Sequence, residues 1–66
     1  MQIQVNGELR HIAEASTISD LLVLLEMVGR RVAVELNQDI VPKSQHPSTV
    51  LKQGDVVEVV HAIGGG

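Results

Sequence analysis

The residues with the clearest chemical potential are the last three, Gly64, Gly65 and Gly66, which follow a valine-rich run at 56–62. Such a run of β-branched residues predicts a strand in a hydrophobic core, which would lead directly into the glycines. Three extended residues reach roughly 10 Å, and glycine has no side chain to clash with a narrow tunnel. Glycine-rich ends are often merely frayed. The alternative is a thin tail that carries the carboxylate of Gly66 into the active site of another protein.

The other reactive side chains form no recognisable site. His11, His46 and His61 fall on three separate expected elements with no i, i+4 pair, so we predict no zinc site. The acidic residues are scattered, and we interpret them as solvated charges rather than as an acid–base pair. The glycines have no helix after them, so they do not form a phosphate-binding motif.

The composition narrows the classes of function. A chain of 66 residues makes one domain and has little room for an enclosed catalytic cavity. It has no aromatic residue and a formal net charge of −3, so we expect neither nucleic acid nor an anionic membrane as a partner. The absence of cysteine excludes disulfides, thiolate metal sites and a cysteine nucleophile. With no signal sequence and no long apolar run, we expect a cytoplasmic protein whose partner has a basic docking face.

The first half of the chain predicts a hairpin and a helix. Residues 1–5 alternate between apolar and polar, and Asn6-Gly7 is a strong hairpin signal, so residues 8–13 form the return strand. A two-residue turn would place Ile12 on the core face and Leu9 outside, whereas a three-residue turn with a bulge would reverse this. We favour the two-residue turn.

The helix is expected to begin after Thr17, an N-cap with Asp20 in the first turn, and to end before Gly29. Its apolar face comprises Ile18, Leu21, Leu22, Leu25 and Val28.

The second half predicts three strands, at 32–36, 40–41 and 56–62, with a polar loop at 43–48 that has room for one helical turn. A helix and strands that each have one apolar face must cover each other. The fold class is therefore α+β, with a mixed sheet of four to five strands around one helix and the first and last strands parallel at its centre. We expect a domain at 1–63 and a flexible tail at 64–66. The predicted core is Ile3, Val5, Leu21, Leu22, Leu25, Val34, Leu36, Leu51, Val57 and Val59.

The last strand also predicts a docking surface. If Val57 and Val59 face the helix, then Val56, Glu58 and Val60 point to the opposite face. Two valines without a core to join, beside the glycine tail, indicate a surface that contacts a partner protein.

The whole chain resembles the β-grasp, ubiquitin-like proteins. The resemblance lies in the order of elements, in residues 51–55 (LKQGD) before the final strand, and in the Gly-Gly end. Three details resemble the ThiS family, the bacterial sulfur carriers of thiazole synthesis. These are the length, Asn37 followed by residues 40–42 (IVP), and the VVEVV run that leads into the glycines. Two residues depart from the pattern: Arg10 replaces a common apolar residue and Gln38 a common turn glycine.

The resemblance implies that the chain is a substrate rather than an enzyme and binds no cofactor itself. A ThiF-like adenylyltransferase would use ATP and Mg²⁺ to activate the Gly66 carboxylate. A sulfur donor enzyme would then supply sulfur to form a thiocarboxylate, and a ThiG-like thiazole synthase would accept it. Gly64 and Gly65 would provide the passage, and Val56, Glu58 and Val60 the docking surface. A molybdopterin-synthase-type carrier, a ubiquitin-like modifier and a β-grasp interaction module with an inert tail remain as alternatives.

Overall fold

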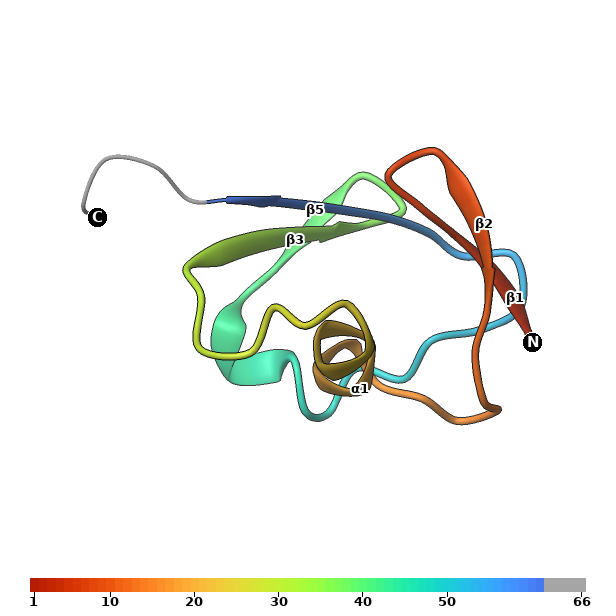
Figure 1. Cartoon of the computed structure of the whole chain (residues 1–66), viewed down its shortest axis with the longest axis horizontal. Helices are drawn as coiled ribbons and strands as arrows, with labels where there is room; N and C mark the ends of the chain where they lie inside the picture. The colour runs from red at the N-terminus through yellow and green to blue at the C-terminus, as the bar shows by residue number, and fades with distance from the viewer. Residues whose placement is uncertain (62–66) are drawn as a thin grey trace.

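A sheet wraps one side of helix α1 in the computed structural model, which describes residues 1–61 (Figure 1). Residues 62–66, which include Gly64, Gly65 and Gly66, lie outside the described residues, so the expected tail stays a prediction. In chain order the elements are β1 (Gln2–Val5), β2 (Glu8–His11), α1 (Ile18–Leu24), β3 (Val32–Leu36), β4 (Asp39–Val41), a 3₁₀ turn (Lys43–Gln45) and β5 (Val56–His61).

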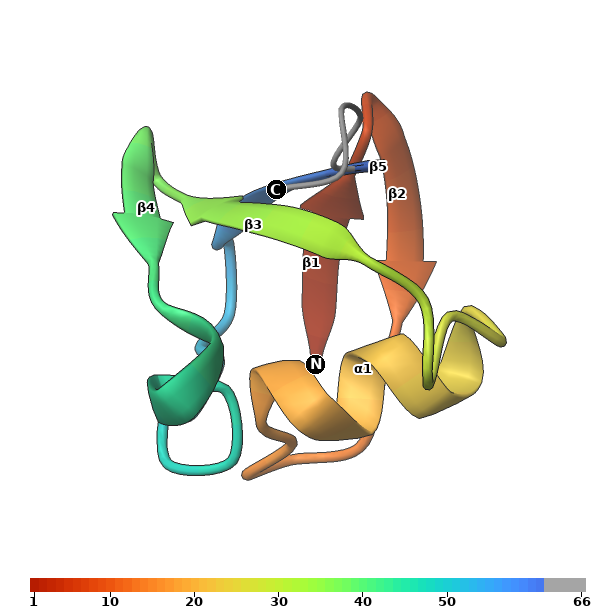
Figure 2. The same cartoon turned by 90° about the vertical axis from the view of Figure 1, so that its left-hand side faces the viewer.

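The strand order is β2-β1-β5-β3-β4, which makes a mixed five-stranded sheet. β1 and β5 are parallel neighbours, and the other three pairings are antiparallel. The prediction that the first and last strands lie side by side is confirmed. β5 is the central strand, so it is hydrogen-bonded on both edges, and Figure 2 shows α1 on one side of the sheet.

The β1–β2 turn has two residues, as predicted. Val5 pairs with Glu8 across it, and Asn6 and Gly7 take φ values of 49° and 83°, the left-handed region that Asn-Gly favours. This register buries Ile12 and leaves Leu9 68% exposed. A bulge would have exchanged the two faces, so the turn determines which residues reach the core.

The helix begins where the sequence predicts. The N–H of Asp20 donates to the Thr17 hydroxyl at 3.1 Å, and the N–H of Thr17 donates to the Asp20 carboxylate at 2.9 Å. This reciprocal capping box satisfies N–H groups that have no partner inside the helix.

The helix ends earlier than predicted. α1 stops at Leu24, not next to Gly29. Val28, which we expected on the apolar face, is 67% exposed, and Leu25 is only half-buried. The predicted helical periodicity was therefore wrong beyond the second turn, since α1 has seven residues.

Glu26 explains the early end. It adopts φ 58°, and its N–H donates to the Val23 carbonyl at 3.0 Å. The N–H of Met27 donates to the Leu22 carbonyl at 2.9 Å, which completes a Schellman motif. Glycine usually occupies the left-handed position of this motif, so a glutamate there leaves no signal in the sequence.

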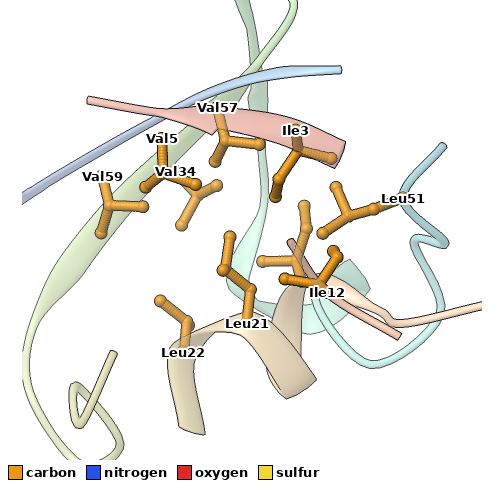
Figure 3. Packing of buried hydrophobic residues seen from close by; sticks show 10 residues of the cluster. Ile3, Val5, Ile12, Leu21, Leu22, Val34, Leu51, Val57 and Val59 are labelled. Carbon is orange, nitrogen blue, oxygen red and sulfur yellow. The ribbon is translucent and has the colours of Figure 1, made fainter. Parts of the chain in front are cut away.

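The core lies between α1 and the concave face of the sheet (Figure 3). Leu36, which we placed in it, is only half-buried at the edge, as is Leu25. The side chain of His46 is buried, and no pattern in the sequence predicted this. The buried hydrophobic residues are Ile3, Val5, Ile12, Ile18, Leu21, Leu22, Val34, Leu51, Val57 and Val59.

Candidate functional site

The convex face of β5 carries the predicted docking residues. Val57 and Val59 are buried under α1, so the alternating Val56, Glu58 and Val60 point away from the helix. Val56 is 38% exposed and Val60 55% exposed. This orientation is the one that the sequence predicted, and it leaves the side chains open to a partner.

Strand pairing extends this surface beyond β5. Val56 pairs with Gln4 of β1, which pairs in turn with Leu9 of β2. Residues that are opposite each other in a ladder share a face, so Leu9 joins the surface at one side of the sheet.

On the other side, Glu58 pairs with Glu35 of β3, which pairs with Ile40 of β4. Ile40 is 74% exposed and therefore adds a large apolar side chain to the same face. No pattern in the sequence assigned Leu9 and Ile40 to this surface, because only the strand order shows that they lie on the same face as Val56 and Val60. We call this face, comprising Leu9, Ile40, Val56, Glu58, Val60 and Glu35, the docking face.

Asn6 holds β5 on its β1 edge. The β1–β5 ladder ends at the pair Val5–Val57, and the N–H of Asn6 then donates to the Val57 carbonyl at 3.0 Å. Beyond it, the Asn6 side chain accepts from the N–H of Val59 at 2.8 Å and donates to the Val59 carbonyl at 3.1 Å. The amide thus takes the place of one more residue of β1 and pairs β5 nearer to its end.

Asn37 does the same on the β3 edge. Its N–H donates to the Val56 carbonyl at 2.8 Å, and its side-chain oxygen accepts from the N–H of Val56 at 2.9 Å. Its side-chain nitrogen also donates to Asp55 at 3.1 Å. Two turn asparagines therefore fix β5 from both edges, and neither role was recognised in the sequence.

Within residues 1–61, no group of three or more His, Asp or Glu side chains is arranged to hold a metal ion. The Nε2 of His46 lies 3.1 Å from the Val41 carbonyl, which gives this buried ring a structural hydrogen bond. In the same part of the chain, no helix has the length and apolar character needed to cross a bilayer. The chemistry predicted for Gly64, Gly65 and Gly66 lies outside the described residues.

Comparisons with known proteins agree on one family. The model of the ThiS family matches residues 3–66. The sulfur carrier protein ThiS of Bacillus subtilis is 35% identical over 65 residues, which cover 97% of this chain and 98% of that protein. A thiazole synthase of Paramagnetospirillum magneticum is 42% identical over all 66 residues, but the chain spans only 20% of that protein. The crystal structure of a thiamine biosynthesis protein (ThiS) from Geobacter metallireducens superposes with a TM-score of 0.86 at 33% identity, covering 100% of both chains.

A mixed five-stranded sheet around one helix, with parallel first and last strands, defines a β-grasp, ubiquitin-like domain. The chain belongs to the ThiS family.

Proposed function

We propose that the chain is a sulfur carrier that donates sulfur for thiazole synthesis in thiamine biosynthesis, with Gly66 as the residue that holds the sulfur. The observation that carries the proposal is the position of β5. Its convex face is open to a partner, and the strand runs towards the glycines in a chain that matches the ThiS family through residue 66. In this role the chain is a substrate, and it acts in the cytoplasm.

The proposed chemistry begins with a carboxylate that is a poor electrophile. A terminal carboxyl group has a pKa of about 3.5, so at neutral pH it is ionised and resists attack. A ThiF-like adenylyltransferase would join the Gly66 carboxylate to the α-phosphate of ATP and release pyrophosphate, with Mg²⁺ neutralising phosphate charge. Sulfide sulfur from a donor enzyme would then attack the acyl carbon, and AMP would leave as the thiocarboxylate forms.

The fixed position of β5 supports this role. A reacting atom must be placed accurately, because an error of about 1 Å can cost around a hundredfold in rate. The Asn6 and Asn37 side-chain amides hold β5 on both edges at 2.8–3.1 Å, so the strand has a defined position relative to the docking face. Gly64 and Gly65 would then provide the narrow passage to the acyl carbon.

The docking face supports the expected partners. It combines apolar side chains with the carboxylates of Glu35 and Glu58, which face the same way through their strand pairing. A partner with apolar and basic residues complements such a surface. We assign this face to the ThiF-like adenylyltransferase and to the ThiG-like thiazole synthase. The similarity to part of the Paramagnetospirillum magneticum thiazole synthase supports the second assignment.

The test is the intact mass of the chain after incubation with a ThiF-like adenylyltransferase, a sulfur donor enzyme, ATP and Mg²⁺. We expect a gain equal to the difference between one sulfur and one oxygen atom, and no gain when ATP is omitted. Deleting Gly66, or adding one residue after it, should abolish the gain and leave the circular dichroism melt unchanged.

An extended variant that still gains sulfur without being trimmed back to Gly66 would contradict the proposal. The mass of the protein isolated from its native cell should likewise show Gly66 as the terminal residue. Isopeptide adducts with lysines of other proteins would support the modifier alternative instead.

A further inference from the structure

A second contact surface lies at the end of the domain where β5 finishes. It is a groove of about 530 Å³ between the end of α1, the segment before β3 and the 3₁₀ turn. Figure 1 shows the segment before β3 and the 3₁₀ turn on the same side of the molecule as the end of β5, and Figure 2 looks at this side directly. Because α1 lies on the concave side of the sheet, the groove and the docking face are on opposite sides of β5.

The walls of the groove are largely apolar. They include Leu22, Val23, Met27, Val28 and Val32. Val23 lies on the face of α1 that points away from the core, and Val28 follows the early end of the helix, so the two side chains are 63% and 67% exposed. In a chain of this size, neighbouring valines that remain open to solvent indicate a contact site.

The rim of the groove carries positively charged side chains, whereas the chain as a whole has a negative net charge. Arg30, Arg31 and Lys43 line it, which are three of the five Lys and Arg residues in a chain with a formal net charge of −3. All eight Asp and Glu residues lie within the described residues 1–61, and none of them lines the groove. A positive rim around an apolar floor complements an acidic segment with apolar side chains.

Hydrogen bonds hold the His46 side of the groove in place, while the Met27 side chain can change its conformation. His46, which lines it, is 5% exposed, and its Nε2 lies 3.1 Å from the Val41 carbonyl. The N–H of Ser19 donates to the His46 carbonyl at 3.2 Å, so the 3₁₀ turn is tied to both α1 and β4. Met27 is half-buried, and its unbranched side chain can adjust to the shape of an apolar group. A preformed site lowers the ordering cost of binding.

The groove also lies beside the end of β5, the strand that precedes the residues proposed to react. Val32 lines it and pairs with His61, the last described residue of β5, so the two residues share a face of the sheet. A protein bound in the groove would therefore lie next to the strand that leads to Gly66.

We propose that the groove binds an acidic segment, with apolar side chains, of the thiazole-synthase-like enzyme that accepts the sulfur. This inference rests on the proposed function, because that function provides the acceptor. The acceptor is chosen over the adenylyltransferase because a thiazole synthase of Paramagnetospirillum magneticum contains a segment similar to this whole chain. When a carrier-like domain and a synthase domain belong to one protein, each is held at a high effective concentration near the other, which favours contact between them.

The test is isothermal titration calorimetry of the full chain against the ThiG-like thiazole synthase and the ThiF-like adenylyltransferase of the same organism. Arg30→Glu and Lys43→Glu each reverse a charge on the rim. Arg10→Glu and Lys52→Glu reverse a charge away from the groove and serve as matched controls. We expect each rim variant to weaken binding to the synthase about tenfold, and each control to stay within about twofold. Binding of the adenylyltransferase should not change with the rim variants.

The outcomes separate this proposal from the proposed function. Equal synthase binding by rim and control variants would overturn the groove proposal, while sulfur loading at Gly66 would still support the carrier. A rim effect on the adenylyltransferase alone would overturn the choice of the synthase. Self-association of the parent chain that the rim variants abolish would assign the groove to a second copy instead. A parent chain that binds neither enzyme and gains no sulfur would overturn both.

Discussion

The Asn6 amide gives the sharpest test of how the fold positions β5. Asn6→Gly keeps the positive φ of 49° accessible but removes both side-chain hydrogen bonds to Val59. Val59 is only 4% exposed, so water cannot freely replace the lost partners. A net contribution of about 0.5–1.5 kcal/mol per hydrogen bond predicts that the free energy of unfolding falls by about 1–3 kcal/mol.

Gln38→Gly is the matched control. Gln38 takes φ 74° in the β3–β4 turn and its side chain is exposed, so glycine relieves backbone strain there without removing a contact to β5. We expect this variant to be neutral or slightly more stable, which is the opposite sign from Asn6→Gly. Asn6→Asp should also be destabilised, because its second carboxylate oxygen would face the Val59 carbonyl, now 3.1 Å from the amide nitrogen.

The assay is urea unfolding followed by far-ultraviolet circular dichroism, since the chain has no aromatic residue for fluorescence. Hydrogen exchange of the Val59 amide gives a local readout, and it should accelerate in Asn6→Gly. If the stability of Asn6→Gly stayed within about 0.5 kcal/mol of the parent, the range of an inert surface change, the Asn6 side chain would not hold β5.

Three further predictions follow from burial, docking and backbone conformation. Leu21→Ala should lower the free energy of unfolding by about 2–5 kcal/mol, because Leu21 is 1% exposed. Leu25 is only half-buried, so Leu25→Ala should lower it clearly less in the same urea experiment. Equal costs would contradict the observed end of the helix. Glu26 adopts a φ of 58°, which costs a residue with a Cβ about 1–2 kcal/mol, so Glu26→Gly should raise the melting temperature. A lower melting temperature would contradict this prediction. Val60→Asp should weaken binding of both enzymes in calorimetry with an unchanged melt, and unchanged affinity for both would exclude Val60 from the docking face.

Local signals predicted the parts of the fold that depend on neighbouring residues. Asn6-Gly7 specified a two-residue turn, and the alternation along β1 and β5 specified which side chains are buried. Thr17 and Asp20 marked the start of the helix through a contact between residues three apart. Each of these features depends on geometry that a few consecutive residues determine.

The end of the helix could not be predicted in the same way. Gly29 suggested a stop, and Val28 had the correct spacing for the apolar face, but the chain turns at Glu26 instead. The left-handed conformation of a glutamate is allowed because the surrounding structure supports it, with Met27 packed against the core. Tertiary packing therefore overrode the local preference.

The candidate site was predicted on one strand and missed across strands. Alternation was enough to place Val56, Glu58 and Val60 on one face, but Leu9 and Ile40 reach that face only through the strand order β2-β1-β5-β3-β4. The pairing of Asn6 with Val59 joins residues 53 positions apart, which no local pattern can indicate.

The two faces of β5 make stability and docking separable by mutation. Val57 and Val59 belong to the core, so their replacement would destabilise the domain and confuse a loss of stability with a loss of docking. The side chain of Val56 is 38% exposed and that of Val60 is 55% exposed. The N–H and the carbonyl of Val56 both form hydrogen bonds with Asn37. Val60 therefore allows a charge to be added to the docking face with the least disturbance of the fold. The rim residues Arg30 and Lys43 are also exposed, on the other side of β5. A carrier that contacts its acceptor through both surfaces should lose affinity in either variant, and the double variant Val60→Asp/Arg30→Glu should show additive losses, since distant sites without shared partners add within about 0.5 kcal/mol.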